Sequence, residues 1–338
     1  MTDQPSVHVD FPPVENGLDY LKNVVKLLAQ DEGQVSPRTL KYAVLHLQAA
    51  TEVLLKYRLS FEHWTLVLHD LDLSKKNPGK RVTREMFDAG EFVSCQLKET
   101  VLRLRTVVGL PIDPEDEEQI LSLANSRNAL QHYGLTDSEG TIEVRTAAVL
   151  DFLLRFLDDH LLPKLKDTDR ERFDEDVEFI RSGLARIRAF VEWRMERLKV
   201  KLEPLRDRTV QCPHCRQWAL VTGGELASCL FCPWTGDPRG YALDYVIHIS
   251  RLPWRSTPTE GPFEQPAMPP IDPCPLCGVV AAVPGVATAA APDHPTTFCF
   301  NCGVALPDED RRDPADRREQ GAAERDAGAM GSAGGESA

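Results

Sequence analysis

The sequence predicts a mainly α-helical protein that ends in two small β modules and a disordered tail. From about residue 15 to residue 205, apolar residues recur every three or four positions, which is the period of an amphipathic helix. Beyond that region, eight of the nine cysteines form four C-x-x-C pairs, a pattern typical of small metal-binding modules. With 338 residues, the chain is long enough for two or three domains.

Changes in this pattern divide the chain into six segments. Both ends are predicted to be disordered, because the first is polar with prolines and the last is charged and then rich in Gly, Ala and Ser. The segments are 1–14 (disordered), 15–205 (helical bundle ending in a long helix), 206–240 (first β module), 241–270 (a linker that begins helix-like and becomes Pro-rich), 271–307 (second β module) and 308–338 (disordered tail).

The helical region is expected to contain six helices separated by turn signals. Gly109-Leu110-Pro111 ends one helix, and the acidic run after Asp113 suits the start of the next, because carboxylates stabilise the positive end of the helix dipole. Residues 135–145 are expected to form a turn with a short extended piece. The helices are expected near 18–28, 37–71, 84–107, 113–134, 147–164 and 171–203.

The last of these helices carries apolar residues at an alternating four-three spacing over nearly three heptads. This spacing predicts a seam for another helix, which belongs either to the same bundle or to a second subunit. The residues of the seam are Phe173, Val177, Ile180, Leu184, Ile187 and Val191.

The C-x-x-C pairs predict two metal sites with four sulfur ligands each. One such turn aims two thiolates at one point, and two turns complete a tetrahedral site that selects zinc or iron. Because short loops close more readily than long ones, neighbouring pairs are expected to share a site. The first site then consists of Cys212, Cys215, Cys229 and Cys232, and the second of Cys274, Cys277, Cys299 and Cys302.

Each β module is therefore expected to be a zinc ribbon with one structural Zn²⁺, since four cysteine ligands leave no position for a substrate. Rubredoxin-like iron is the alternative, and it is closest for the second site. Gly278 and Gly303 directly follow C-x-x-C pairs, and a glycine there suits a tight turn in which backbone N–H groups bond the sulfurs. His214 is expected to face solvent. Three aromatic residues serve either as base-stacking surfaces or as the ribbons' apolar centres: Trp218, Trp234 and Phe300.

The charge balance limits the possible partners. The net charge is −13, distributed as −7 over 1–205, −2 over 206–307 and −4 over 308–338. No segment has the basic excess that marks non-specific nucleic-acid binding, so any RNA contact must use a local patch. The sequence shows neither a signal peptide nor a membrane-spanning apolar run, and we expect a cytoplasmic protein.

Two stretches of the helical region resemble one known family. The stretch 126–134 (SRNALQHYG) closes a helix, and the earlier stretch 45–56 (LHLQAATEVLLK) carries small-x-x-Glu-x-x-x-Lys. Together they resemble the HEPN family, whose nuclease members have Arg, a polar residue that is often Asn, three further residues and His. The resemblance covers about residues 15–165, at most to 203, and implies a HEPN-like helical bundle.

The surroundings of the motif distinguish it from chance matches. A loose Arg-x(4–6)-His pattern occurs four times, as Arg58/His63, Arg127/His132, Arg155/His160 and Arg208/His214. Only Arg127 is followed by Asn, and only this match closes a helix downstream of the Glu-Lys stretch. The site residues that the resemblance implies are therefore Arg127, Asn128 and His132.

The resemblance implies an endoribonuclease that needs no metal, in which the ribose 2′-OH attacks the adjacent phosphate. His132 would move the protons, Arg127 would hold the phosphate, and Asn128 would orient the imidazole or the phosphate. In an ideal helix a five-residue offset places two side chains about 140° apart, so one chain completes such a site poorly. The family accordingly implies a homodimer whose two motifs combine.

Plainer interpretations are open at each position. The alternatives are that Arg127 pairs with a carboxylate on a neighbouring helix, that His132 caps its helix, and that Glu52 and Lys56 form an intrahelical pair at i,i+4. The first functional hypothesis is a toxin or defence endoribonuclease whose ribbons recognise a target or partner, with Arg103 and Arg105 offsetting the acidic charge. The second is a non-catalytic scaffold that binds a protein or nucleic acid. A thiol-based sensor ranks last.

Overall fold

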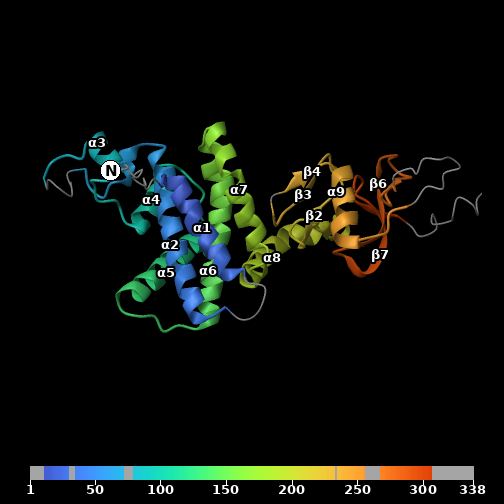
Figure 1. Ribbon diagram of the computed structural model, residues 1–338, viewed down its shortest axis with the longest axis horizontal. Helices are drawn as coiled ribbons and strands as arrows, with labels where there is room; N and C mark the ends of the chain where they lie inside the picture. The colour runs from blue at the N-terminus through green and yellow to red at the C-terminus, as the bar shows by residue number, and fades with distance from the viewer. Residues whose placement is uncertain (1–10, 30–34, 72–78, 233, 256–266, 307–338) are drawn as a thin grey trace, which may run out of the picture. The chain divides into compact units, whose positions relative to one another are not determined.

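The computed structural model describes residues 11–29, 35–71, 79–232, 234–255 and 267–306 (Figure 1). The chain divides into a helical unit, Met1–Lys199, and a second unit, Val200–Ala338, that holds the strands. This confirms the predicted order of a helical bundle followed by small β structure. The predicted disordered ends lie largely outside the described residues. None of the helices in the described ranges combines the length and the apolarity that a membrane crossing needs.

The helical unit consists of a bundle with short 3-10 and π-helical turns between its helices. The elements are α1 (Pro13–Leu28), α2 (Pro37–Ser60), η1 (Trp64–Val67), α3 (Arg84–Asp88), α4 (Leu97–Thr106), α5 (Pro114–His132), α6 (Glu139–Phe156), η2 (Leu157–Leu161), η3 (Leu162–Lys164), α7 (Asp167–Leu184) and α8 (Arg188–Leu202), the last of which ends in the second unit.

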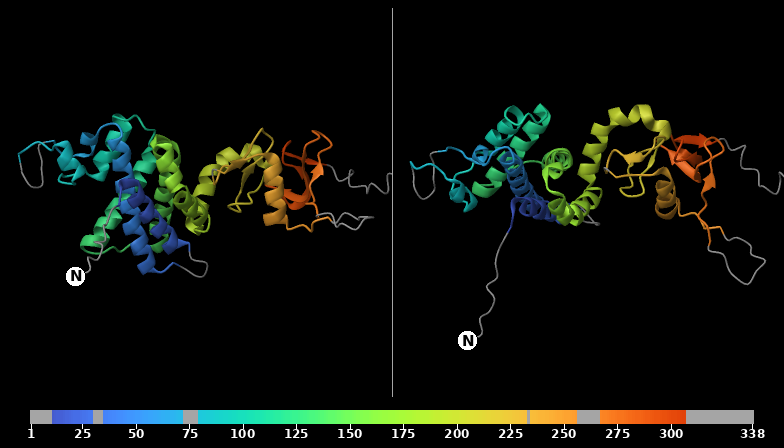
Figure 2. Two further views of the ribbon diagram at one scale, coloured as in Figure 1. Left: turned by 45° about the horizontal axis from the view of Figure 1, so that its top comes forward. Right: turned by 90° about the horizontal axis from the view of Figure 1, so that it is seen from above.

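The core of this unit lies where α1 packs between α2 and α7, and where α5 and α6 pack against α2 (Figures 1 and 2). Leu18, Leu47 and Leu54 are fully buried there. Glycine permits the closest approaches: a Cβ at Gly17 would lie 2.5 Å from Leu54 Cδ2, and a Cβ at Gly183 would lie 2.0 Å from Val25 Cγ1. Removing a fully buried leucine side chain from such a core typically destabilises a protein by about 2–5 kcal/mol.

Two predicted helices end earlier than expected. The helix predicted over 37–71 ends at Ser60, because His63 adopts an extended backbone and its Nδ1 accepts a hydrogen bond from Thr65 N–H. The helix predicted over 84–107 is two helices, α3 and α4. Gly90 ends the first one with a φ of 68°, a left-handed conformation that glycine adopts without strain.

Two further predictions were wrong in the second half of the bundle. Residues 135–145 contain no strand, because Ser138 caps α6 by accepting a hydrogen bond from Thr141 N–H, and helix begins at Glu139. The helix predicted over 171–203 is broken between α7 and α8, where Arg186 and Ile187 donate to carbonyls three residues back. Most of the predicted seam is buried within this single chain: Phe173, Val177, Ile180, Leu184 and Ile187.

The second unit forms one antiparallel sheet in the order β4-β3-β2-β1-β6-β7-β8, with β5 paired to β6 (Figure 1). Both cysteine clusters therefore belong to a single sheet, which β1 and β6 join at the pair Val210 and Thr288. The elements are η4 (Glu203–Arg208), β1 (Thr209–Gln211), β2 (Trp218–Val221), β3 (Ala227–Cys229), β4 (Thr235–Gly236), α9 (Pro238–Tyr245), η5 (Val246–Ser250), β5 (Asp272–Pro273), β6 (Val280–Thr288), β7 (Ala291–Cys299) and β8 (Val304–Leu306).

A small apolar core joins the two halves of this sheet. Helix α9 packs on β6, and Tyr245 lies 5.3 Å from Phe300 between ring centroids. Phe300 is fully buried, so of its two predicted roles the structure supports the apolar centre and not the base-stacking surface. The backbones also meet directly, because a Cβ at Gly303 would lie 2.9 Å from Gly223 Cα. Because short β modules have small cores, contacts of this kind make up much of the packing in this unit.

Candidate functional site

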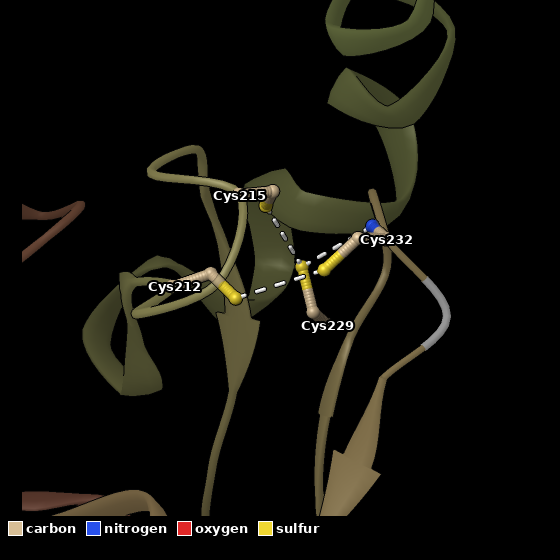
Figure 3. A group of neighbouring side chains, drawn as sticks. All are labelled: Cys212, Cys215, Cys229 and Cys232. Carbon is tan, nitrogen blue, oxygen red and sulfur yellow. Dashed lines mark hydrogen bonds between the residues drawn. The ribbon is translucent and has the colours of Figure 1, made fainter. Parts of the chain in front are cut away.

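The first cysteine cluster lies between the β1–β2 turn and the end of β3 with the turn that follows it (Figure 3). Its four sulfur atoms lie within 4.8 Å of one another. Cys212 Sγ is 3.7 Å from Cys232 Sγ, and Cys215 Sγ is 3.7 Å from Cys229 Sγ. A tetrahedral site with zinc–sulfur bonds of about 2.3 Å has sulfur–sulfur edges of about 3.8 Å. The cluster therefore has the dimensions of a metal site.

The second cluster has the same geometry and lies at the ends of β5 and β7 and in the turns that follow these strands. Cys274 Sγ is 3.8 Å from Cys302 Sγ, and Cys277 Sγ is 3.9 Å from Cys299 Sγ. It is the more open of the two clusters, since Cys277 is exposed whereas Cys274 and Cys299 are buried. The eight cysteines thus form two groups that could hold metal ions, and neighbouring C-x-x-C pairs share a group.

Tight turns hold the cysteines in place. Gly278 N–H donates to Cys274 O and Gly303 N–H donates to Cys299 O, both at 2.8 Å, with φ of 74° and 68°. Arg216 occupies the same position after Cys212 with a φ of 66°, although it is not a glycine. Backbone N–H groups also bond sulfur in the second C-x-x-C turn of each cluster, where Cys302 N–H lies 3.4 Å from Cys299 Sγ and Cys232 N–H lies 3.5 Å from Cys229 Sγ.

The thiols of the second cluster differ in acidity. Hydrogen bonding, chiefly from the Val279 backbone N–H, lowers the pKa of Cys277 to about 7. Burial raises the pKa of Cys299 to about 11. A cation binds thiolates, so it must displace protons from the buried members of the cluster, and binding is expected to weaken as the pH falls.

His214 is exposed, as the sequence predicted, and it also contacts two neighbouring side chains. Its ring centroid lies 4.4 Å from the Trp234 ring, and its Nε2 lies 3.4 Å from Asp244 Oδ2. Tyr241 donates its hydroxyl to Trp234 O at 2.9 Å, so Trp234 is held on the first cluster with nearly half of its surface exposed.

A cavity of about 960 Å³ lies in the helical unit, and residues of both motif stretches line it. Glu52 and Lys56 of α2 and Arg127 of α5 share its wall. Sequence alone favoured an intrahelical pair for Glu52 and Lys56, and they do form one, with Lys56 Nζ 2.5 Å from Glu52 Oε1. Lys56 also donates to Ser94 Oγ at 2.8 Å, which fixes its ammonium at the cavity.

The ionisable groups on this wall leave one cation without a carboxylate. Arg84 Nε lies 3.0 Å from both carboxylate oxygens of Asp88, and Lys56 pairs with Glu52. Within the described residues, the hydrogen bond found for the Arg127 guanidinium goes to Asn128 Oδ1, at 2.9 Å, and no carboxylate pairs with it. Arg127 therefore gives the cavity an anion-attracting point inside an acidic protein.

His132 and Asn128 are placed differently from Arg127. Both are exposed, and neither is part of the cavity wall, whereas Gln131 is. Helix α5 ends at His132 because Tyr133 and Gly134 N–H both donate to Ala129 O. Within a single chain, Arg127 therefore lines the cavity and His132 is exposed on the protein surface, as expected for two residues five positions apart on a helix.

Sequence reasoning missed one residue beside this motif and misjudged two others. Arg145 of α6 donates to Ser126 Oγ at 2.6 Å and lies 3.5 Å from Asp137 Oδ2, so it fastens the loop that follows His132. Arg103 donates to two backbone carbonyls, and Arg105 pairs with Glu117 at 2.5 Å. Both are occupied by contacts within the protein. No local sequence signal marks Arg145, because its partners lie 8 and 19 positions away.

No protein-family model matches this chain, and no curated protein or solved structure is significantly similar to it.

Proposed function

We propose that this protein is a HEPN-type endoribonuclease, a toxin or defence effector that acts as a homodimer in the cytoplasm. One observation carries the proposal: the Glu-Lys pair of α2 and Arg127 of α5, which come from two separate motif stretches, line the same cavity. Nothing in helical periodicity requires that two stretches about 70 residues apart face each other. Their convergence supports one shared site over an ion pair and an arginine that are unrelated to each other.

The reaction assigned to this site is transesterification within RNA. His132 takes the proton from the ribose 2′-OH, whose oxygen then attacks the adjacent phosphorus. The bond from phosphorus to the 5′ oxygen breaks, a 2′,3′-cyclic phosphate forms, and the leaving 5′ oxygen takes up a proton. Arg127 stabilises the negative charge on the phosphorane, because a guanidinium matches two phosphate oxygens at once.

The homodimer follows from the placement of these two groups. Within one chain His132 lies outside the cavity wall that Arg127 lines. A site that needs both groups at one phosphate is therefore completed by a second copy, in which His132 of one protomer meets Arg127 of its partner.

RNA cleavage by the purified full-length protein tests this function. Wild type is expected to leave 2′,3′-cyclic phosphate and 5′-hydroxyl ends, and Arg127→Ala and His132→Ala are each expected to reduce the rate at least a hundredfold. Mixing the two inactive variants should restore activity, because one site of each mixed dimer is intact. Intact RNA with wild type would refute the proposal, and no recovery on mixing would refute the shared site.

We further propose that each cysteine cluster holds one structural zinc ion. The sulfur–sulfur distances of 3.7–3.9 Å fit a tetrahedral tetrathiolate, and all four positions are taken by protein ligands. Metal analysis is expected to give two zinc ions per chain and a colourless protein. A visible thiolate-to-iron absorption would assign iron to the cluster instead.

A second candidate function is a scaffold without catalysis. The exposed apolar residues around the second cluster favour a protein partner, among them Met268, Leu276 and Val279. A weakly acidic surface with exposed apolar side chains suits protein contacts better than RNA. Expression of His132→Ala separates the two functions: a scaffold keeps its full cellular effect, whereas a nuclease loses it.

A further inference from the structure

The cavity of the helical unit is much larger than the contact of one arginine with one phosphate requires. Its volume of about 960 Å³ lies at the upper end of the range for small-molecule sites. Its charged groups form two neutralised pairs, Lys56 with Glu52 and Arg84 with Asp88, which leaves Arg127 as the one charge on the wall without an oppositely charged partner among the described residues. One end of a ligand placed here is therefore expected to be anionic.

Two pairs of aromatic rings lie on the remaining wall. Tyr20 and His46 lie on it with ring centroids 5.8 Å apart. Phe87 and Phe92 lie on another part of the wall, stacked with ring centroids 4.7 Å apart. Aromatic faces bind flat, polarisable rings by stacking, and every nucleobase has such a face. Shape and chemistry together indicate a ligand with one flat ring and one anion.

A buried acceptor adds a further requirement. Gln48 lines the cavity although it is only 4 % exposed, and its Oε1 has no hydrogen-bond partner within the described residues. A buried carbonyl oxygen without a donor is unfavourable by about 1–3 kcal/mol, so native structures seldom keep one without a reason. A ligand in the cavity can supply the missing N–H, and each nucleobase carries at least one N–H donor on its edge.

We propose that this cavity binds one unpaired nucleotide of the RNA, with its base against the aromatic wall and its 3′-phosphate at Arg127. The inference rests on the proposed nuclease function in that it makes this pocket the base-binding part of the same site. It adds a substrate class, namely single-stranded RNA with a base turned out of the stack, which the acidic surface could not hold by charge alone.

An anionic lipid would also combine an apolar body with a negative end. It offers no N–H donor to Gln48, however, and an alkyl chain does not use the faces of aromatic rings. The nucleotide accounts for all three properties of the cavity: the unpaired guanidinium, the aromatic wall and the buried acceptor.

The test is titration calorimetry of the full-length protein with nucleoside 3′-monophosphates, which it cannot cleave. Ribose phosphate, inorganic phosphate and a medium-chain fatty acid serve as comparison ligands. The nucleotides are expected to bind about fivefold to a hundredfold more tightly than ribose phosphate, because stacking of one base contributes this much to affinity. Equal affinity for ribose phosphate, or saturable binding of the fatty acid alone, would overturn the proposal.

Variants locate the binding in the cavity. Arg127→Ala is expected to weaken binding about tenfold to a hundredfold, as for loss of a charge-assisted contact, whereas Arg170→Ala, an exposed arginine on α7, leaves it unchanged. Ala49 lies half-buried on the cavity wall, so Ala49→Trp fills the space and should abolish binding while the helical circular dichroism is retained. Unaltered binding by both Arg127→Ala and Ala49→Trp contradicts the assignment.

The two proposals fail in different ways. Nucleotide binding that these variants remove, together with absence of RNA cleavage, would support the pocket and refute the nuclease. Cleavage that Ala49→Trp leaves at the wild-type rate and KM would support the nuclease and refute the pocket.

Discussion

The helical unit and the cysteine-rich unit are stabilised by different kinds of interaction. In the helical unit, leucines from distant helices fill the core, and buried ion pairs connect helices. In the second unit, strands of two to nine residues surround two S4 clusters, and part of the packing is backbone against backbone. The first unit should therefore be sensitive to side-chain volume, and the second to metal and to glycine.

Removal of the metal is expected to have the largest effect and to separate the two units. A structural zinc site contributes on the order of 10 kcal/mol to the folding of a small domain. A strong chelator should unfold the second unit and leave the helical unit intact, with amide exchange lost at the strands and kept at α1 and α2. Cys229→Ser should do the same, whereas Cys95→Ser should not. Simultaneous melting of both units would show that the comparison is wrong.

The next largest effect is expected in the helical unit, at its buried charges. Asp151 is 2 % exposed and accepts from Arg194 at 2.5 Å and Arg155 at 3.2 Å, with Arg197 3.7 Å away. Asp151→Asn should lower the free energy of unfolding of this unit by about 3–5 kcal/mol, because the guanidiniums lose their buried counter-charge. Glu196→Gln removes an exposed pair and should change it by less than about 1 kcal/mol. Denaturant unfolding would measure both, and equal effects would contradict the burial argument.

Glycine substitutions probe the backbone contact of the second unit. Gly303 and Gly278 have nearly the same left-handed φ, 68° and 74°, but only Gly303 has a neighbour within 4 Å. Gly278→Ala should destabilise by about 1–2 kcal/mol through backbone strain, and Gly303→Ala by about 1–3 kcal/mol more through overlap with Gly223. Thermal unfolding of the metal-loaded protein gives the difference, and a difference of zero would mean that the sheet can move apart at this point.

The smallest effects are expected for a matched pair of helix glycines. A Cβ at Gly183 would overlap Val25, whereas Gly140 on α6 has open space around it. Gly183→Ala should destabilise the helical unit by about 1–3 kcal/mol, and Gly140→Ala should stabilise it by about 0.5–1 kcal/mol. Stabilisation by both variants would show that helix propensity, and not the packing of α7 on α1, dominates at Gly183.

The sequence predicted elements well where local residues decide them. The region of helices, the first-turn prolines and the acidic start of α5 follow from short-range chemistry, and so does the grouping of the cysteines, since each cluster closes a short loop. The errors have local causes as well. Gly90 breaks a helix that its apolar spacing continues across, and Ser138 starts one in a stretch where Gly140 and Thr141 are weak helix formers.

The candidate site in the helices could be predicted only in part. The motif residues were found by resemblance, but their surroundings were not. That Arg127 lies on a cavity with Lys56, that Arg145 holds the following loop, and that Arg103 and Arg105 are occupied all depend on contacts between residues far apart in the chain. Helical period says which face of a helix is apolar, but not which other helix meets its polar face.

By itself, then, the sequence determined the helical and β halves and the two groups of four cysteines, because helix period and loop closure act over a few residues. The tertiary structure alone decided that Val210 and Thr288 join both clusters into one sheet, that Phe300 is buried, and that the Glu-Lys pair and Arg127 face one cavity. Those outcomes depend on how whole elements pack, where the free energy comes from burying surfaces brought together from distant parts of the chain.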